Sequence, residues 1–427
     1  MKIKVINKTY EEVLAIEQQK SYPPKKVNIF WRTLMFLLAV PTLIKFKYKL
    51  RKVGMDKLGR REPALFLMNH SSFTDMKMAV ASLFPRKFNV VCTFDALMGK
   101  KWLMKQIGCI PTHKYVADLS LVRTMSNVAK KNRHSILLYP EACYSADGKT
   151  TVIPDSLAGC IKMLDIPVVM ITTYGAFARD PLYNNLQIRK VDISAEMKYI
   201  LSPEEIKEKS AAEINEIIQK CFDLDYFKWQ QENKVKIDEP FRAEGLNRVL
   251  YKCPHCEAEG VMQSAGAELY CSECGHKYTL DEYGYLVHDG EGGRFTHVPD
   301  WYSWERECVK RELEDGTYSL SDKVDIYMLV DTKALYSVGD GELMQTCEGI
   351  RLTGLDGKLD ILQKPQAAYT LNTDFNWYEL GDIICLADKG RLYYCFPRTK
   401  RDIVSKARLA TEEMYKIYKE NKSLNHE

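Results

Sequence analysis

Apolar strand patterns alternate with amphipathic helix patterns through the first half of this chain. Four runs rich in Leu, Val, Ile and Phe have the composition of buried strands, and they occupy residues 63–69, 88–93, 134–140 and 167–173. Helix-like segments lie between them, at residues 75–83, 120–132 and 158–164. Strands that alternate with helices form a largely parallel sheet with helices packed on its faces. The sequence therefore predicts an α/β domain over residues 63–240.

Two polar loops follow strands of this predicted sheet. Residues 70–75, HSSFTD, come directly after the strand at 63–69, and residues 140–145, PEACYS, follow the strand at 134–140. In α/β sheets, ligands bind beyond the carboxyl ends of the strands. We therefore expect the functional site at this edge of the sheet, where the two loops lie.

His70 and Asp75 have the residue types and the spacing for general-base chemistry. A neutral imidazole can remove the proton of an attacking hydroxyl group, and a carboxylate bonded to its other nitrogen fixes the tautomer. The base would activate a hydroxyl of the substrate, so we expect Ser71 and Ser72 to begin a helix and not to act as nucleophiles. Alone, this spacing is a weak pattern, because a surface histidine followed by a helix-start acid also produces it.

Four blocks taken together resemble the glycerolipid acyltransferase family, the 1-acylglycerol-3-phosphate and lysophospholipid acyltransferases. NHSSFTD resembles the HxxxxD motif of that family, and the other three blocks follow in the family's order: GCIPTHK at 108–114, PEACYS at 140–145 and IPVVMI at 166–171. The resemblance extends over residues 30–220, close to half of the chain. It implies phospholipid biosynthesis: transfer of a fatty acyl group from acyl-CoA or acyl carrier protein to a hydroxyl of a lysophospholipid or related glycerolipid.

The resemblance also implies a role for each matching residue. His70 would be the general base, and Asp75 would orient it. Glu141 would hold the acceptor or the geometry of the site. Gly108 and Pro140 would shape the loops that carry the second and third blocks.

The phosphate site departs from the family pattern. Lys114 and Tyr144 both stand where arginine is usual, and Ala142 and Cys143 replace Gly and Thr. Lys114 would contact the acceptor phosphate as a point charge, whereas arginine binds phosphate with two parallel bonds. A phosphate monoester carries close to two negative charges and benefits most from such bonds. We therefore predict that the acceptor is a lysolipid with a substituted head group in preference to lysophosphatidate.

Residues 1–62 form a basic leading segment with one apolar run. Residues 1–60 contain 14 Lys/Arg and 4 Asp/Glu, although the net charge of the chain is only +4. The uncharged run between Arg32 and Lys45 has 12 residues, whereas a membrane-spanning helix needs about 20. A buried core helix is one interpretation. We favour an interfacial helix, flanked by cations, that binds an anionic membrane without crossing it.

The expected location is the cytoplasmic face of a membrane, as a peripheral or monotopic protein. The first 25 residues are polar and lack the apolar core of a secretory signal peptide. The chain has 13 cysteines, an odd number that fits a reducing compartment better than a disulfide framework.

Four of these cysteines form a metal-binding pattern. Cys253, Cys256, Cys271 and Cys274 have the spacing C-x2-C-x14-C-x2-C. Two CxxC turns can direct four thiolates at one ion, which makes a closed tetrahedral zinc site without an open position for a substrate. The pattern resembles a rubredoxin-type zinc ribbon, expected over residues 245–290, so the zinc would be structural. Four buried or redox-active cysteines are the alternative.

The last third of the chain predicts a separate unit. Residues 295–427 contain a helix, then short strand patterns with Gly and Asp between them, then a charged amphipathic helix. This order predicts a small α+β domain, either barrel-like or resembling the pleckstrin-homology fold.

Three other functions are compatible with these features. In the first, the ribbon is the functional part of a regulatory or nucleic-acid-binding protein. In the others, the His70/Asp75 site belongs to a thioester hydrolase or to a lipid-binding protein without catalytic activity. Acidic side chains outnumber basic ones over residues 245–300, which is the wrong sign for binding nucleic acid. Acyl transfer at an anionic membrane surface, with a thioester donor and a lysolipid acceptor, is the function that we predict.

Overall fold

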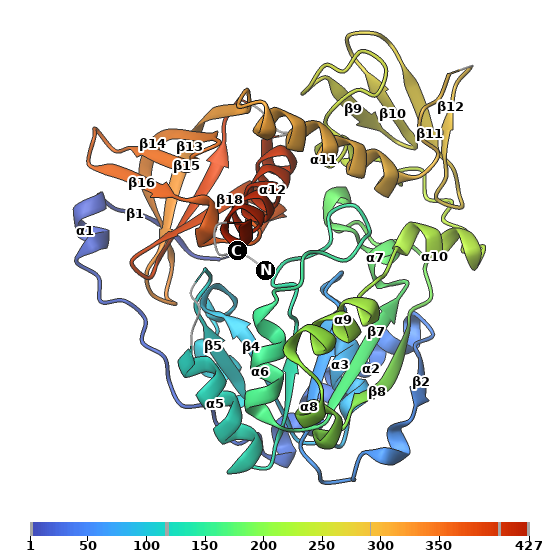
Figure 1. Cartoon of the computed structure of the whole chain (residues 1–427), viewed down its shortest axis with the longest axis vertical. Coiled ribbons are helices and arrows are strands. Elements are labelled where there is room, and N and C mark those ends of the chain that lie inside the picture. The colour runs from blue at the N-terminus through green and yellow to red at the C-terminus, as the bar shows by residue number, and fades with distance from the viewer. Residues whose placement is uncertain (1–2, 116–118, 291, 400–402, 425–427) are drawn as a thin grey trace.

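The computed structural model of the chain describes residues 3–115, 119–290, 292–399 and 403–424. Its strands form three sheets, which define an α/β domain, a ribbon and a C-terminal domain (Figure 1). The predicted basic segment 1–62 is divided between two of these parts. Strand β1 (Val5–Asn7) pairs in parallel with β14 (Leu335–Thr346) of the C-terminal domain, and the short helix α1 (Tyr10–Leu14) follows it.

Seven strands form the sheet of the α/β domain, in the order β2-β8-β7-β3-β6-β4-β5. Strands β7, β3, β6, β4 and β5 run parallel, whereas β8 is antiparallel to β7 and parallel to β2. The strands are β2 (Lys49–Val53), β3 (Leu65–Met68), β4 (Phe88–Thr93), β5 (Cys109–Thr112), β6 (Ser135–Leu138), β7 (Val168–Tyr174) and β8 (Ser194–Leu201). The predicted largely parallel α/β sheet is therefore confirmed.

The side chains of β3 build a core on each face of this sheet. Phe66 and Met68 belong to one apolar cluster, whereas Leu65 and Leu67 belong to another. Successive side chains of a strand point to opposite faces, so a strand that is buried on both sides must be apolar throughout. Helices α2 (Ile29–Lys45) and α3 (Asp75–Leu83) cover the first face, and α5 (Leu119–Lys130), α6 (Ser156–Leu164) and α9 (Ala211–Cys221) cover the second. The shorter helices are α4 (Lys101–Gln106), α7 (Ala176–Arg179), α8 (Pro203–Glu208) and α10 (Tyr226–Glu232).

The ribbon is a small antiparallel sheet followed by a long helix. Its strands pair in the order β12-β11-β10-β9 and span β9 (Met262–Ala265), β10 (Glu268–Cys271), β11 (Lys277–Leu280) and β12 (Leu286–His288). Helix α11 (Val298–Glu314) connects the ribbon to the C-terminal domain. Trp301 of α11 is fully buried, packs 5.1 Å from the ring of Tyr278, and donates to the carbonyl of Lys252. The helix is thereby fixed to the ribbon.

The C-terminal domain is an antiparallel sheet closed at one side by a helix. The strand order is β16-β15-β14-β13-β19-β18-β17, so the last strand returns beside the first. The remaining bounds are β13 (Ser319–Leu329), β15 (Gly349–Gly354), β16 (Leu359–Gln363), β17 (Asn372–Trp377), β18 (Gly381–Asp388), β19 (Arg391–Pro397) and α12 (Ile403–Leu424). Within the described ranges β16 and β17 do not pair, so the sheet does not close into the barrel that we considered. The resemblance to the pleckstrin-homology fold stays a prediction.

Candidate active site

His70 and Asp75 lie on the turn that joins β3 to α3. The Oδ2 atom of Asp75 accepts hydrogen bonds from the backbone N–H groups of Ser71, at 2.7 Å, and Ser72, at 2.9 Å. The same oxygen lies 3.1 Å from Nδ1 of His70. Asp75 is the first residue of α3, where the helix dipole and the unpaired N–H groups favour a carboxylate. The local turn therefore brings the predicted pair together.

The two side chains of this pair differ in exposure. The Asp75 side chain is fully buried, whereas 23% of the His70 side chain is exposed. With its proton on Nδ1, shared with Asp75, the imidazole keeps a lone pair on Nε2. A base held from behind by a buried carboxylate can accept a proton from a molecule that enters the site.

Two tyrosine rings contact the imidazole. The ring centroid of His70 lies 4.5 Å from that of Tyr139 and 4.0 Å from that of Tyr144. Tyr144 also stacks against Phe73 of the His70 turn, at 5.4 Å. Tyr144, at the family's arginine position, thus packs against the His70 imidazole. The Tyr139 contact is not predictable from the sequence, because this residue ends a strand pattern and belongs to no motif.

Glu141 connects the His70 turn to a second loop through hydrogen bonds. Its side chain is buried, and Oε1 accepts the backbone N–H of His70 at 2.8 Å while Oε2 accepts that of Thr151 at 3.0 Å. Burial raises the pKa of Glu141 to about 7, although both backbone bonds oppose the shift. Of the two roles expected for Glu141, these contacts favour maintenance of the site's geometry over contact with the acceptor. Pro140, the residue before it, is also buried.

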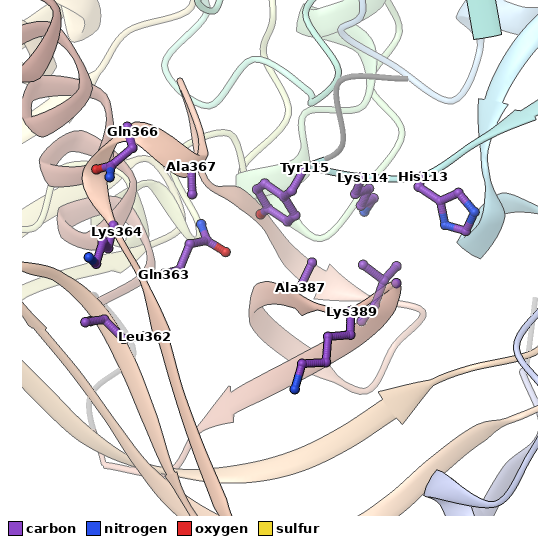
Figure 2. Close-up of a pocket in the computed structure, with 12 residues that line it drawn as sticks. His113, Lys114, Tyr115, Leu362, Gln363, Lys364, Gln366, Ala367, Ala387 and Lys389 are labelled. Atoms are coloured by element: carbon purple, nitrogen blue, oxygen red, sulfur yellow. The ribbon is translucent and has the colours of Figure 1, made fainter. Parts of the chain in front are cut away.

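Lys114 lies at the contact between the α/β domain and the C-terminal domain. Its Nζ atom is 2.7 Å from Oδ2 of Asp95 and 5.8 Å from the ring centroid of Tyr394 in β19. Burial lowers the pKa of Lys114, but the Asp95 carboxylate outweighs burial and raises it. Next to it is a cavity of about 400 Å³ between the two domains (Figure 2). A phosphate contact through Lys114 would compete with this ion pair.

Gly108 precedes β5 in a conformation that requires glycine. Its φ is +84°, and a Cβ atom there would lie 2.3 Å from Cγ2 of Val27 and 2.8 Å from Nδ2 of Asn89. The Asn89 side chain donates to the Gly108 carbonyl at 2.7 Å. Gly108 therefore shapes the start of the second block through backbone packing.

A buried polar network supports the His70 turn from β7 and α7. Asn69 exchanges hydrogen bonds with Thr173, through Nδ2 at 2.8 Å and Oδ1 at 2.7 Å. The Ser72 hydroxyl donates to Asp180 at 2.6 Å, and Arg179 donates to Thr74 at 2.6 Å. No sequence pattern predicts these contacts, because nothing local marks a polar side chain as a partner of a turn about 100 residues away.

The outward face of α2 is apolar. Ile29, Phe30, Leu37, Leu38 and Ile44 are 58–72% exposed, and at 100° per residue they fall on one side of the helix. The opposite side faces the domain core. None of the helices in the described ranges is long and apolar enough to cross a membrane.

This apolar face extends beyond α2. Trp102 of α4 is 65% exposed and packs 5.6 Å from Trp31, while Phe73 of the turn between β3 and α3 is 56% exposed. We call the exposed residues of α2, together with Trp102 and Phe73, the apolar surface. Exposed apolar patches on proteins are commonly found where a membrane or another macromolecule binds.

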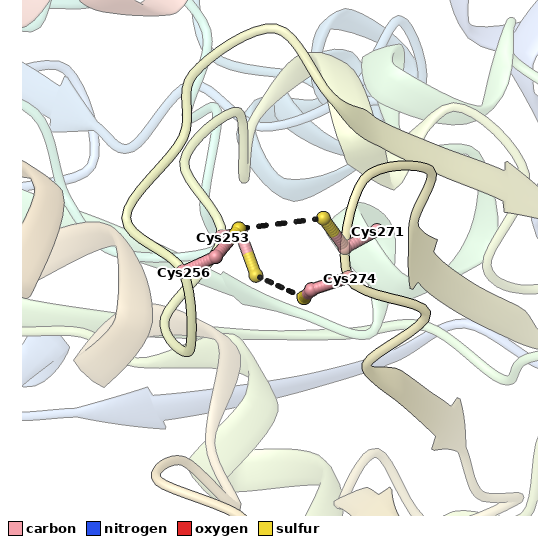
Figure 3. Close-up of side chains that lie close together, drawn as sticks. All are labelled: Cys253, Cys256, Cys271 and Cys274. Atoms are coloured by element: carbon pink, nitrogen blue, oxygen red, sulfur yellow. Dashed lines mark hydrogen bonds between the residues drawn. The ribbon is translucent and has the colours of Figure 1, made fainter.

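The four ribbon cysteines converge on one point (Figure 3). Their Sγ atoms all lie within 4.8 Å of one another, and the Cys253–Cys274 and Cys256–Cys271 pairs are 3.7 Å apart. Four sulfurs at 2.3 Å from a tetrahedral zinc would be about 3.8 Å apart, whereas a disulfide bond measures about 2.05 Å. All four thiols are free. The donor set and its spacing fit a tetrahedral zinc ion.

Comparison with known proteins finds a family model that matches part of the α/β domain. Residues 49–173, which contain all four blocks, match the family model described as Acyltransferase. One similar solved structure is that of the 1-acyl-sn-glycerophosphate (LPA) acyltransferase PlsC from Thermotoga maritima. It is 12% identical with a TM-score of 0.37, and the similarity covers 48% of this chain and 80% of that one. A search of curated proteins found no match.

Proposed function

We propose that this chain is an acyltransferase that moves a fatty acyl group from a thioester to a hydroxyl of a lysophospholipid or related glycerolipid. The observation that carries the proposal is the His70/Asp75 pair, a partly exposed base bonded to a buried carboxylate, inside a segment that matches the Acyltransferase family. Acyl-CoA and acyl carrier protein are both suitable donors, because each presents the acyl group as a thioester.

The reaction requires only proton transfer by the protein. Nε2 of His70 takes the proton of the acceptor hydroxyl while the hydroxyl oxygen attacks the thioester carbonyl carbon. The C–S bond then breaks, and the imidazolium returns the proton to the leaving thiolate. Asp75 stabilises the imidazolium between these steps. The products are an ester and a free thiol, so no serine or cysteine of the chain is needed as a nucleophile.

The proposal is tested by His70→Ala with labelled acyl-CoA and a panel of lysolipids, followed by lipid mass spectrometry. Loss of a general base should reduce transfer by about 10²–10⁴-fold. Ser71→Ala is the matched control, because a serine nucleophile would make it equally inactive. Near-normal turnover in His70→Ala would reject the mechanism. Thioester consumption that is independent of acceptor would instead identify a hydrolase.

The apolar surface supports action at a membrane. Phe73 is 56% exposed on the turn that carries His70, so a bilayer in contact with both α2 and Phe73 would bring lipid to the site. The cations Lys45, Lys47 and Lys49 are exposed at the end of α2 and favour anionic head groups. We place the protein on the membrane as a peripheral or monotopic protein of the cytoplasmic face.

The packing of Tyr144 bears on the choice of acceptor. Its ring lies against His70 and Phe73, and a phenol offers one hydrogen bond where arginine offers a fork. We therefore retain the preference for a lysolipid with a substituted head group. Tyr144→Arg should shift the ratio of kcat/KM values toward lysophosphatidate. A wild-type enzyme that uses lysophosphatidate at least as well as every other acceptor would contradict this.

One structural zinc ion in the ribbon completes the proposal. Four free thiols at tetrahedral spacing support it, and a site with four protein ligands has no position for a substrate. The ribbon residues Cys253, Cys256, Cys271 and Cys274 would hold the ion, which would stabilise the fold and take no part in acyl transfer.

A further inference from the structure

The C-terminal helix α12 reaches the loop that carries the third block. Arg408 of α12 is buried, and its Nη1 donates to the backbone carbonyl of Tyr144 at 3.2 Å. Its Nη2 donates to Sγ of Cys143, also at 3.2 Å. Figure 1 shows α12 between the sheet of the C-terminal domain and the α/β domain. One guanidinium therefore binds two consecutive residues of a loop that lies 264 positions earlier in the sequence.

A buried ion network fixes the orientation of Arg408. Oε1 of Glu412 accepts from Nε of Arg408 at 3.2 Å and from the Thr370 hydroxyl at 2.6 Å. Oε2 of Glu412 accepts from Arg306 of α11 at 2.7 Å. Burial raises the pKa of Glu412, but the two arginines outweigh burial and hold it at about 2. The carboxylate therefore stays ionised and holds the guanidinium in place at any pH near neutrality.

The loop that Arg408 binds has a strained backbone. Ala142 has a φ of +57°, the left-handed conformation, at a position where the resembling family has glycine. A residue with a Cβ atom is disfavoured in this conformation. The strained residue is followed directly by Cys143 and Tyr144, the two that bind Arg408. Contacts from outside the loop are therefore needed to hold this conformation.

The same loop places a side chain on the base. The Tyr144 ring lies 4.0 Å from the His70 ring, and its carbonyl is one of the two groups that Arg408 holds. We propose that Arg408 is a positioning residue of the active site, which holds residues 142–144 so that Tyr144 packs against His70. The C-terminal domain is thereby an integral part of the catalytic unit. This inference rests on the proposed acyltransferase function.

The test compares Arg408→Lys with Arg351→Lys in the full-length protein. Lysine at position 408 keeps the charge that Glu412 needs but cannot bind Tyr144 and Cys143 together. Arg351 makes the matched control, because it forms an exposed ion pair with Asp360 in the same domain. Arg408→Lys should lower kcat about 10- to 100-fold, as expected for a misplaced group in the site, and change the KM for the thioester less than threefold. Arg351→Lys should behave as wild type.

Two further measurements separate positioning from a general loss of stability. The thiol of Cys143 is buried, so its alkylation, followed by peptide mass spectrometry, should become faster in Arg408→Lys while the other buried cysteines keep their rates. Adding Ala142→Gly to Arg408→Lys should recover part of kcat, because glycine adopts the loop conformation without strain.

The proposal is overturned if Arg408→Lys keeps kcat within twofold of Arg351→Lys, or if the alkylation of Cys143 is unchanged. If the wild-type protein transfers no acyl group, the proposed function fails. The alkylation rate of Cys143 then still decides whether Arg408 holds the loop.

Discussion

Asp75→Asn isolates the charge of the carboxylate behind His70. Three donors converge on Oδ2: the N–H groups of Ser71 and Ser72, at 2.7 and 2.9 Å, and Nδ1 of His70, at 3.1 Å. An asparagine oxygen in the same place can accept all three bonds, but it is neutral. The asparagine NH2 group then occupies the position of Oδ1, which is buried and has no hydrogen-bond partner among the described residues.

The expected magnitude follows from these contacts. A hydrogen bond to a charged acceptor contributes about 1 kcal/mol more than one to a neutral acceptor, and an unsatisfied buried NH2 group costs about 1–3 kcal/mol. With three such bonds weakened, the free energy of unfolding should therefore fall by about 4–6 kcal/mol. The imidazolium loses its counter-charge, so kcat should fall by about 10²–10⁴-fold, which corresponds to about 2.7–5.4 kcal/mol in the activation free energy.

The assay follows release of free thiol from acyl-CoA together with formation of acylated lipid, alongside a thermal melt. Asp56→Asn is the matched control, because it makes the same chemical change at an exposed carboxylate of the same domain. A folded Asp75→Asn protein that keeps more than a third of the wild-type kcat would refute the reasoning, since the buried charge would then be irrelevant to the chemistry.

Three further predictions concern Glu141, the ribbon and the apolar surface. Burial raises the pKa of Glu141 from 4.5 to about 7, so between these pH values the folded chain holds a proton that the unfolded chain has released. The free energy of unfolding of wild type, relative to Glu141→Gln, should therefore fall as the pH rises from about 4.5 to about 7. A constant difference in urea titrations at pH 5 and pH 7 would contradict this. The purified protein should contain one zinc per chain by elemental analysis, and Cys274→Ser should release it and make the ribbon sensitive to protease; a fully resistant, metal-free protein would reject the site. Leu38 is 68% exposed, so Leu38→Glu should weaken binding to anionic vesicles at least tenfold, whereas Leu362→Glu, at a 45% exposed leucine of the C-terminal domain, should bind as wild type.

The features that the sequence predicted depend on contacts between near neighbours. His70 and Asp75 meet because both lie on one turn, five residues apart. The strands around Leu65–Met68 were recognisable because a strand buried on both faces must be apolar throughout. The cysteine pairs converge because each CxxC turn directs two thiols to one side of a short ribbon.

The tertiary structure decided which distant segments meet. Sequence shows that residues 33–44 are apolar, but only packing decides that one face of α2 is buried on the sheet while the other is exposed. Lys114 pairs with Asp95, and β1 pairs with a strand more than 300 residues away. Arg408 binds the loop of Tyr144 across a separation of 264 residues. A charge or a strand edge has many sterically suitable partners along a chain, and packing of the three domains against one another selects among them. The partner therefore cannot be predicted from a local sequence pattern.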